Sequence, residues 1–189
     1  MSAPSLLDHV RPVAAGAHVT LVSGPVAIQD PAGVRVVRVE TAREMLAAVE
    51  AALPADLAIF AAAVGDWRPV AARDSKIKKD GAEPAPLRLV ENPDLLATIA
   101  RRTEGRPALV VGFAAETDAV LQHARDKIAR KGCDWLVAND VSPEGGVMGG
   151  TANTVHLLGR DGSVETWPRL DKDEVGRRLV ERFAALLPR

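Results

Sequence analysis

Short apolar runs alternate with helical stretches along most of the chain. Strand-like runs occur at residues 18–23, 33–39, 57–64, 108–113 and 135–138. Segments with apolar residues at helical spacing occur at residues 41–53, 92–102, 117–132 and 171–187. Strands that alternate with helices predict an α/β protein, in which a mostly parallel sheet is covered on both faces.

Local signals indicate where several helices begin and end. Thr41 and Glu44 form a capping box at the start of one helix. Asn92–Pro93 is expected to cap and start a second helix, and Thr117 to cap a third. Gly132 is the expected residue just after the third helix, because glycine adopts the left-handed conformation that ends many helices.

The remaining segments predict two loops and a hairpin. Residues 68–86 are polar and contain prolines, and residues 142–152 are rich in glycine, so both are expected to be loops. Residues 154–158 and 163–167 flank a Gly-Arg-Asp-Gly turn and predict a late antiparallel hairpin, either at a sheet edge or as an interaction arm. No repeat or linker divides the chain, so we expect one domain over residues 1–189.

Composition and charge exclude several classes of protein. Hydrophobic residues make up 47% of the chain but aromatic residues only 3%, so the core is built from aliphatic side chains. The net charge of -1 argues against nucleic-acid binding by bulk charge. A single cysteine, Cys133, excludes an internal disulfide and a cysteine-based zinc site. We expect a soluble cytoplasmic protein, because no apolar run is long enough to cross a bilayer and no secretory signal is evident.

The longest apolar run, Leu57–Val64, is typical of a strand buried on both faces. The segments that follow this and other predicted strands are rich in small and polar residues. They are residues 23–25 (Ser-Gly-Pro), 65–67 (Gly-Asp-Trp), 112–117 (Gly-Phe-Ala-Ala-Glu-Thr) and 139–141 (Asn-Asp-Val). Ligands bind beyond the carboxyl ends of strands in open parallel sheets, so these segments predict a ligand-binding edge.

Trp67 and Phe113 could stack on a base there or pack in the core.

Basic residues accompany this edge. The run Lys76-Ile77-Lys78-Lys79 is either a solvated charge run or a phosphate-binding segment. Lys127 and Lys131 lie one helical turn apart, near the margin of an apolar stripe rather than on the opposite face. They indicate either a phosphate partner or lysine stems that cover the edge of the core.

Six segments together match a known family in order and spacing. They are residues 61–69 (Ala-Ala-Ala-Val-Gly-Asp-Trp-Arg-Pro), 76–79, 92–96 (Asn-Pro-Asp-Leu-Leu), 111–117, 124–131 and 138–141. From about residue 14 to its end, the chain resembles the bacterial phosphopantothenoylcysteine synthetases, or phosphopantothenate–cysteine ligases. These form the synthetase half of a bifunctional coenzyme A biosynthesis flavoprotein and often follow a flavin-dependent decarboxylase half. The resemblance implies a Rossmann-like three-layer fold and a homodimer formed partly through added β-strands, for which the hairpin at 154–167 is a candidate.

The resemblance also implies a reaction and a site. The expected reaction is the CTP-dependent ligation of 4′-phosphopantothenate to cysteine through an acyl-cytidylate, with Mg²⁺ as the metal ion. Lys76 would contact the triphosphate and be the catalytic residue of the cytidylylation step. The complete nucleotide site implied by the motifs comprises Ala61, Ala62, Asp66, Lys76, Pro93, Asp94, Leu95, Leu96, Phe113, Lys127 and Lys131.

One part of the family pattern is missing. The family's N-terminal segment, with its first parallel strand and its phosphopantothenate contacts, has no counterpart in residues 1–13. Loss of a central strand predicts exposed sheet edges. It also supports the alternative of an N-terminally truncated, non-catalytic homologue that binds nucleotide or dimerises. A Rossmann-type reductase is a third hypothesis, against which the lack of a Gly-x-Gly-x-x-Gly fingerprint counts.

Overall fold

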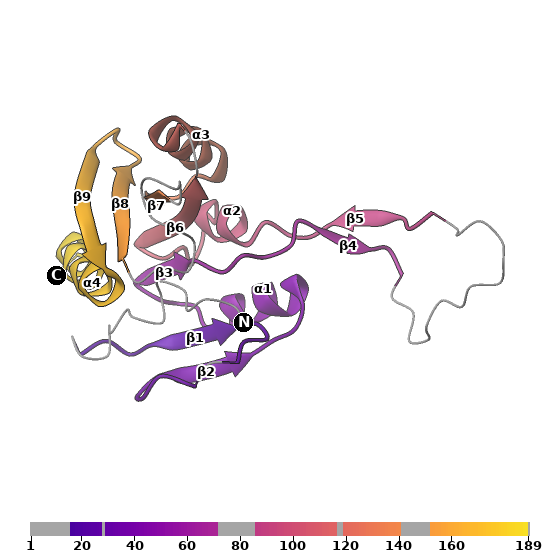
Figure 1. Cartoon of the computed structure of the whole chain (residues 1–189). Helices are drawn as coiled ribbons and strands as arrows, with labels where there is room; N and C mark the ends of the chain where they lie inside the picture. Colours follow the sequence, from indigo (N-terminus) through magenta and orange to yellow (C-terminus); the bar gives the residue numbers. More distant parts are fainter. Residues whose placement is uncertain (1–15, 28, 72–85, 117–118, 141–151, 189) are drawn as a thin grey trace.

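The computed structural model describes residues 16–27, 29–71, 86–116, 119–140 and 152–188 of the chain. Its central sheet has the strand order β3-β6-β7-β8-β9 (Figure 1). The strands are β3 (Leu57–Phe60), β6 (Leu109–Glu116), β7 (Trp135–Asp140), β8 (Ala152–Gly159) and β9 (Val164–Asp171). The first three run parallel, and β8 and β9 add to them in antiparallel fashion. The predicted mostly parallel sheet is confirmed, and the late hairpin forms its edge.

A second, smaller parallel pair stands apart from this sheet. β1 (Thr20–Ser23) pairs with β2 (Arg35–Arg38) in direct register. Within the described residues, β1 pairs with no other strand, and β3 pairs only with β6. In the part of the chain that the structure describes, each of these two strands therefore has one edge without a paired strand.

The position of β3 corrects one prediction. The run Leu57–Val64 was expected to form a strand buried on both faces, but the strand ends at Phe60 and its four residues are only half-buried. An unbroken apolar run is typical of a strand inside a sheet. Here β3 lies at the edge of the central sheet, so it is less covered than its sequence suggests.

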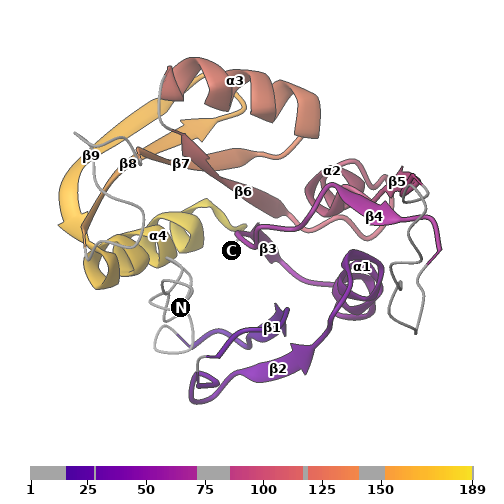
Figure 2. The same cartoon turned by 45° about the vertical axis from the view of Figure 1, so that its right-hand side comes forward.

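Different helices cover the two faces of the central sheet. Figure 2 shows α3 and α4 on opposite sides of β6 and β7. The helices are α1 (Ala42–Ala51), α2 (Leu95–Ala100), α3 (Val120–Lys131) and α4 (Lys172–Leu186). α1, α2 and α3 pack on the face that carries Val110 and Leu136, whereas α4 packs on the face that carries Val111 and Val137. None of the helices in the described part of the chain is long and apolar enough to span a membrane.

The helix ends follow the predicted signals in part. The capping box of Thr41 and Glu44 is present at α1, and Gly132 ends α3 with a φ of 79°. α2 is shorter than predicted, and its cap is Asp94 rather than Asn92, because Asp94 Oδ1 accepts from the Ala97 N–H at 3.0 Å. Ala119, not Thr117, directly precedes α3, and its φ of 42° is left-handed.

The segment predicted as a long polar loop, residues 68–86, instead begins within the first strand of a two-stranded arm, and the second strand of the arm follows its end. β4 (Trp67–Pro69) pairs antiparallel with β5 (Leu89–Glu91), and the arm projects away from the body of the molecule (Figure 1). Residues 72–85 between the strands and the glycine-rich segment 142–151 lie outside the described residues. The prediction missed the arm because its strands are short and lack an alternating apolar pattern, and because their pairing joins distant parts of the chain.

Candidate functional site

The carboxyl ends of β3, β6 and β7 lie at one edge of the central sheet. The three strands are parallel and adjacent in the order β3-β6-β7, so their last residues point toward the same side. β6 extends to Glu116 and β7 to Asp140, so these strands include residues that were predicted to lie at or beyond their ends. Of the four predicted edge segments, residues 112–116 and 139–140 form neighbouring strand ends, and residues 65–67 follow β3 at the start of the β4–β5 arm. The fourth, residues 23–25, ends β1 in the separate pair.

Two hydrogen bonds join the segment after β3 to the segment before α2. Asn92 donates from Nδ2 to the Gly65 carbonyl at 2.8 Å, and its backbone N–H donates to the Asp66 carbonyl at 2.8 Å. These bonds hold Asp66 next to the start of α2. The Asp66 side chain is exposed, as is Ala62, while Ala61 and Pro93 are half-buried.

Asp94 connects α2 to α3. One of its carboxylate oxygens caps α2, and the other forms a short ion pair with the ammonium group of Lys131 at the end of α3. Burial disfavours the charged form of Asp94. The hydrogen bonds from Lys131 and from the Ala97 backbone, together with the positive charges of Lys131 and Arg130, outweigh burial and lower the pKa of Asp94. This carboxylate is ionised throughout the neutral range.

Lys127 reaches the same edge from the preceding turn of α3. Its ammonium group donates to the Phe113 carbonyl at 3.2 Å, near the carboxyl end of β6. Both lysine side chains are half-buried, and Lys131 is only 16% exposed. Their stems cover the margin of the core, while the charged end of Lys127 bonds to the Phe113 carbonyl and that of Lys131 to Asp94. Of the predicted site residues, the structure therefore pairs Lys127 with Phe113 and Lys131 with Asp94.

The side chains of Leu95 and Leu96, which were predicted to line the nucleotide site, are buried in the hydrophobic core. Leu95 packs with Ala42 and Met45 under α1, and Leu96 packs in the main cluster between α2 and the sheet. Gly112 allows this close approach, because a Cβ at that position would lie 2.6 Å from Leu96 Cδ2. Any contact of these two leucines with a ligand would have to come from their backbone.

The predicted catalytic residue, Lys76, lies outside the described residues, as do Lys78 and Lys79. Among the residues that the structure does describe, no three histidine, cysteine, aspartate or glutamate side chains come together in a way that could hold a metal ion.

Two polar residues at this edge were not in the predicted site. Asn139, near the end of β7, has a buried Oδ1 atom with no hydrogen-bond partner in the described structure. Its place after an apolar strand was visible in the sequence, but the orientation of its side chain was not. Lys172, at the start of α4, is a charged residue with only 8% exposure. No sequence signal marked it, because lysine in the first turn of a terminal helix usually faces solvent.

The fold places the chain in the class of Rossmann-like α/β proteins with a mostly parallel sheet. A solved structure of a DNA/pantothenate metabolism flavoprotein from Streptococcus pneumoniae has the same fold, with a TM-score of 0.71 and 16% identity over 95% of this chain and 85% of that one. The chain belongs to the family of the "DNA/pantothenate metabolism flavoprotein C-terminal domain", whose model matches residues 10–187.

Individual relatives narrow this assignment. The chain is 44% identical over 174 residues to the coenzyme A biosynthesis bifunctional protein CoaBC of Vibrio parahaemolyticus, and 41% identical over 171 residues to that of Escherichia coli. The crystal structure of the C-terminal domain of a CoaBC protein matches with a TM-score of 0.76 and 32% identity, covering 96% of this chain and 81% of that one. The resemblance to the synthetase half of CoaBC is therefore confirmed.

The matched relatives are longer proteins. The Vibrio parahaemolyticus alignment covers 91% of this chain but 43% of its relative, and the Escherichia coli alignment covers 89% and 42%. The chain thus spans less than half the length of the curated relatives that it matches.

Proposed function

We propose that the chain carries the CTP-dependent ligation of 4′-phosphopantothenate to cysteine. The observation that carries this proposal is the pair of neighbouring lysines on α3, of which Lys127 donates to the Phe113 carbonyl of β6 and Lys131 bonds to Asp94. An edge with two ammonium groups and adjacent strand ends suits a nucleoside triphosphate, because phosphates bind cations and ligands of parallel sheets bind at this edge. The names of the CoaBC relatives support a role in coenzyme A biosynthesis.

The proposed reaction has two steps. A carboxylate oxygen of 4′-phosphopantothenate attacks the α-phosphorus of CTP, the bond to the β-phosphate breaks, and pyrophosphate leaves. The amine of cysteine then attacks the acyl carbon of the acyl-cytidylate, forms the amide, loses a proton and expels CMP. Negative charge grows on the phosphoryl oxygens in the first step, and fixed cations stabilise such charge.

Each residue of the proposed site has a separate proposed role. Lys76 contacts the triphosphate and stabilises the departing pyrophosphate, while Lys127 and Lys131 bind the nucleotide. Ala61, Ala62, Phe113 and the Pro93–Leu96 segment form the rest of the nucleotide site. Mg²⁺ would neutralise phosphate charge, and the exposed carboxylate of Asp66 suits an ion that arrives with the triphosphate, since Mg²⁺ is usually held by one or two carboxylates together with substrate phosphates.

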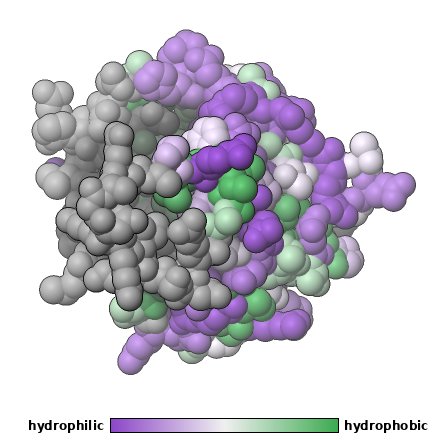
Figure 3. Space-filling model, turned by 90° about the vertical axis from the view of Figure 1, so that its right-hand side faces the viewer, coloured by the Kyte–Doolittle hydropathy of each residue, from purple (hydrophilic) through white to green (hydrophobic). Residues whose placement is uncertain are grey.

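The proposal includes a second copy of the chain as partner, bound through the β4–β5 arm. The arm exposes large apolar side chains: Trp67 is 57% exposed, Leu87 65% and Leu89 51%. Figure 3 views the molecule from the side of the arm and shows hydrophobic surface among polar surface. A projecting ribbon with apolar side chains is suited to pairing with another chain. The 154–167 hairpin, expected either at a sheet edge or as an interaction arm, forms the edge of the central sheet. Because the relatives are bifunctional, the further proposed partner is a decarboxylase half.

The test measures pyrophosphate release from CTP and Mg²⁺, with and without 4′-phosphopantothenate and cysteine. Release that requires 4′-phosphopantothenate and increases with cysteine is the expected result. Lys76→Ala is expected to lower the rate by about 10²–10³-fold, as for loss of other preorganised charge-stabilising groups. Arg160→Ala, which removes a 62% exposed charge on the β8–β9 turn, is the matched control and should leave the rate unchanged.

A specific observation favours a second candidate function. The edges of β1 and β3 that have no paired strand among the described residues support a homologue that binds CTP without turning it over. The same assay separates the two functions: CTP binding without acid-dependent pyrophosphate release would contradict the ligase and support the binding protein.

A further inference from the structure

Asn92 joins two segments that both belong to the proposed nucleotide site. Its side-chain Nδ2 donates to the Gly65 carbonyl at 2.8 Å, and its backbone N–H donates to the Asp66 carbonyl, also at 2.8 Å. Gly65 and Asp66 directly precede β4, whereas Asn92 directly precedes the Pro93–Leu96 segment. Gly65 and Asn92 are 27 residues apart in the sequence, so this one residue connects two distant parts of the site.

The carboxamide of Asn92 is not used to begin the helix that follows it. Asparagine is a good helix cap, yet the side chain that caps α2 is Asp94, which accepts from the Ala97 N–H. The Asn92 carboxamide instead makes a tertiary contact with the segment after β3. A change at Asn92 can therefore break this contact while the cap of α2 stays in place.

The segment that Asn92 contacts has no regular structure of its own. Residues 61–66 lie between β3 and β4 and belong to no helix or strand, and Ala62, Gly65 and Asp66 are exposed. Fixing one conformation of such a loop costs conformational entropy, and a ligand that has to order the loop binds more weakly by that amount. Hydrogen bonds that fix the loop before the ligand arrives remove this cost from binding.

Arg68 orients the Asn92 carboxamide. The Arg68 Nη1 atom lies 3.3 Å from Asn92 Oδ1 and also donates to the Glu91 carbonyl. A guanidinium group can only donate, so Oδ1 is the atom that faces Arg68, and Nδ2 faces Gly65. A carboxamide suits both neighbours because it carries an acceptor and a donor on one carbon. An ionised carboxylate would have no donor for the Gly65 carbonyl.

We propose that Asn92 is a positioning residue, which holds the Gly65–Asp66 loop in the conformation that binds the nucleotide. This inference rests on the proposed function and deepens it. Asn92 acts through the loop rather than by contact with the nucleotide, and the affected ligand is CTP, because the loop carries Ala61, Ala62 and Asp66 of the proposed nucleotide site. Loss of the bond to Gly65 should therefore weaken CTP binding and leave the use of cysteine unchanged.

The experiment compares Asn92→Asp and Asn92→Ala with the unchanged chain. Asn92→Asp keeps the shape and the acceptor for Arg68 but replaces the donor with a second acceptor, whereas Asn92→Ala removes both. Calorimetry measures the affinity for CTP with Mg²⁺, and steady-state assays measure kcat and the KM values for CTP and cysteine. We expect both variants to weaken CTP binding about tenfold, as for loss of one hydrogen bond. KM for CTP should rise, while kcat stays within about twofold and KM for cysteine is unchanged.

Two further variants and a stability measurement serve as controls. Gln122→Glu makes the same amide-to-carboxylate change on an exposed part of α3, where Gln122 donates to Asp126 at 3.1 Å, and should leave CTP affinity unchanged. Asn92→Gln restores a donor and an acceptor on a longer stem and should recover part of the lost affinity. Thermal unfolding without ligand tests for a merely structural role, which would lower the melting temperature but leave the CTP affinity of the folded protein unchanged.

The possible outcomes separate the inference from the proposed function. Unchanged CTP affinity in both variants, with normal binding by the unchanged chain, would refute the role of Asn92 and leave the proposed function intact. Weaker binding in Asn92→Asp but not in Asn92→Ala would show charge repulsion rather than loss of the bond, and would also refute it. If the unchanged chain binds CTP without turnover, the ligase proposal fails, while calorimetry still tests Asn92. If it binds no CTP, both fail.

Discussion

Lys131 and Asp94 form an ion pair that ties the last turn of α3 to the first turn of α2. The Asp94 carboxylate has two structural tasks, since its other oxygen caps α2. Both tasks can be separated by mutation, because asparagine caps helices as well as aspartate does but carries no charge.

We therefore expect Asp94→Ala to destabilise the protein by about 1 kcal/mol more than Asp94→Asn, because only alanine removes the cap. Asp94→Asn should cost less than about 1 kcal/mol, since ion pairs with exposed partners contribute little. Urea unfolding of the two variants and the unchanged chain measures both differences. Equal destabilisation by both variants would contradict the capping role.

The ionisation of Asp94 predicts how the stability of the fold changes with pH. The pKa of Asp94 is lowered in the folded protein. A carboxylate with a lowered folded pKa stabilises the fold fully above its unfolded pKa of about 4 and loses this contribution as the pH falls through the folded pKa. The stability difference between the unchanged chain and Asp94→Asn should therefore be constant near neutral pH and shrink in acid. Unfolding at several pH values below about 5 tests this.

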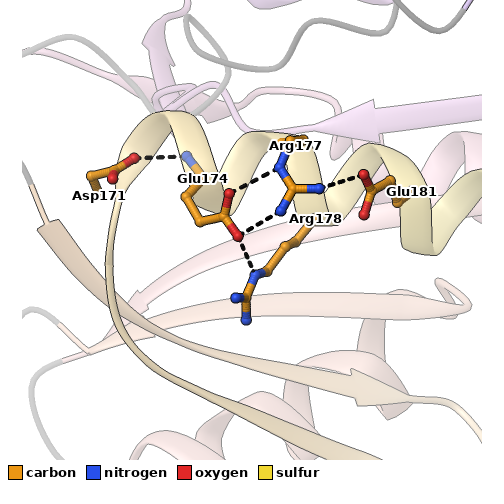
Figure 4. A network of polar contacts seen from close by, with 5 residues as sticks. All are labelled: Asp171, Glu174, Arg177, Arg178 and Glu181. Carbon is orange, nitrogen blue, oxygen red and sulfur yellow. Dashed lines mark hydrogen bonds and ion pairs between the residues drawn. The ribbon is translucent and has the colours of Figure 1, made fainter.

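Glu174 accepts hydrogen bonds from two arginines on the exposed side of α4 (Figure 4). The hydrogen bonds from Arg177, and then those from Arg178, lower the pKa of Glu174 to about 2. Its contribution to the fold is thus present above the ordinary glutamate pKa and lost only as the pH falls toward 2. NMR titration of the side-chain carboxyl carbon should give a midpoint near this value. Arg177→Ala should raise the midpoint more than Arg178→Ala, and the reverse order would contradict the assignment.

Gly112 provides a prediction about packing under α2. A Cβ at this position would approach Leu96 Cδ2 to 2.6 Å and Leu136 Cδ1 to 3.0 Å. Both leucines are buried, so Gly112→Ala is expected to destabilise the protein by about 1–3 kcal/mol through overpacking. Gly24→Ala is the matched control, because its Cβ would meet only Met45 Cε, at 3.9 Å. Equal stability of the two variants in urea would contradict this account.

The arm makes a prediction about assembly. Trp67 and Leu89 lie on the same face of the β4–β5 ribbon, since Trp67 is in register with Glu91 and Pro69 with Leu89. Replacing both by serine should shift a dimer toward monomer by at least tenfold in dissociation constant, because each loses an exposed apolar contact. Sedimentation equilibrium measures the change. Val164→Ser, at a 38% exposed valine of β9, should have no effect.

Much of the fold could be predicted from the sequence because its signals are local. The Thr41 capping box, Gly132 and the apolar stripe of α4 act within a few residues, and each was found at its expected place. The prediction failed where distant segments decide the outcome. The burial of β3 depends on its neighbours in the sheet, and the β4–β5 arm depends on pairing across residues 72–85.

The same distinction applies to the candidate site. Lys127 and Lys131 were predicted because their helical spacing and the family motifs agree, and the structure bonds them to the Phe113 carbonyl and to Asp94. The switch of the α2 cap from Asn92 to Asp94 could not be predicted, because both residues are good caps. Asn92 instead bonds to Gly65, a tertiary contact. The unsatisfied Oδ1 of Asn139 likewise depends on packing around the side chain rather than on sequence pattern.

The separation of β1 and β2 from the central sheet has a consequence for local stability. In the described structure this pair shares no hydrogen-bond ladder with β3, and the chain joins the two units through α1. The pair can therefore open without breaking the ladders of β6 and β7. Its backbone amides are expected to exchange with solvent water through sub-global opening, at a lower free energy than the amides of the central strands. The first two strands and the central sheet would then behave as separate cooperative units within one chain.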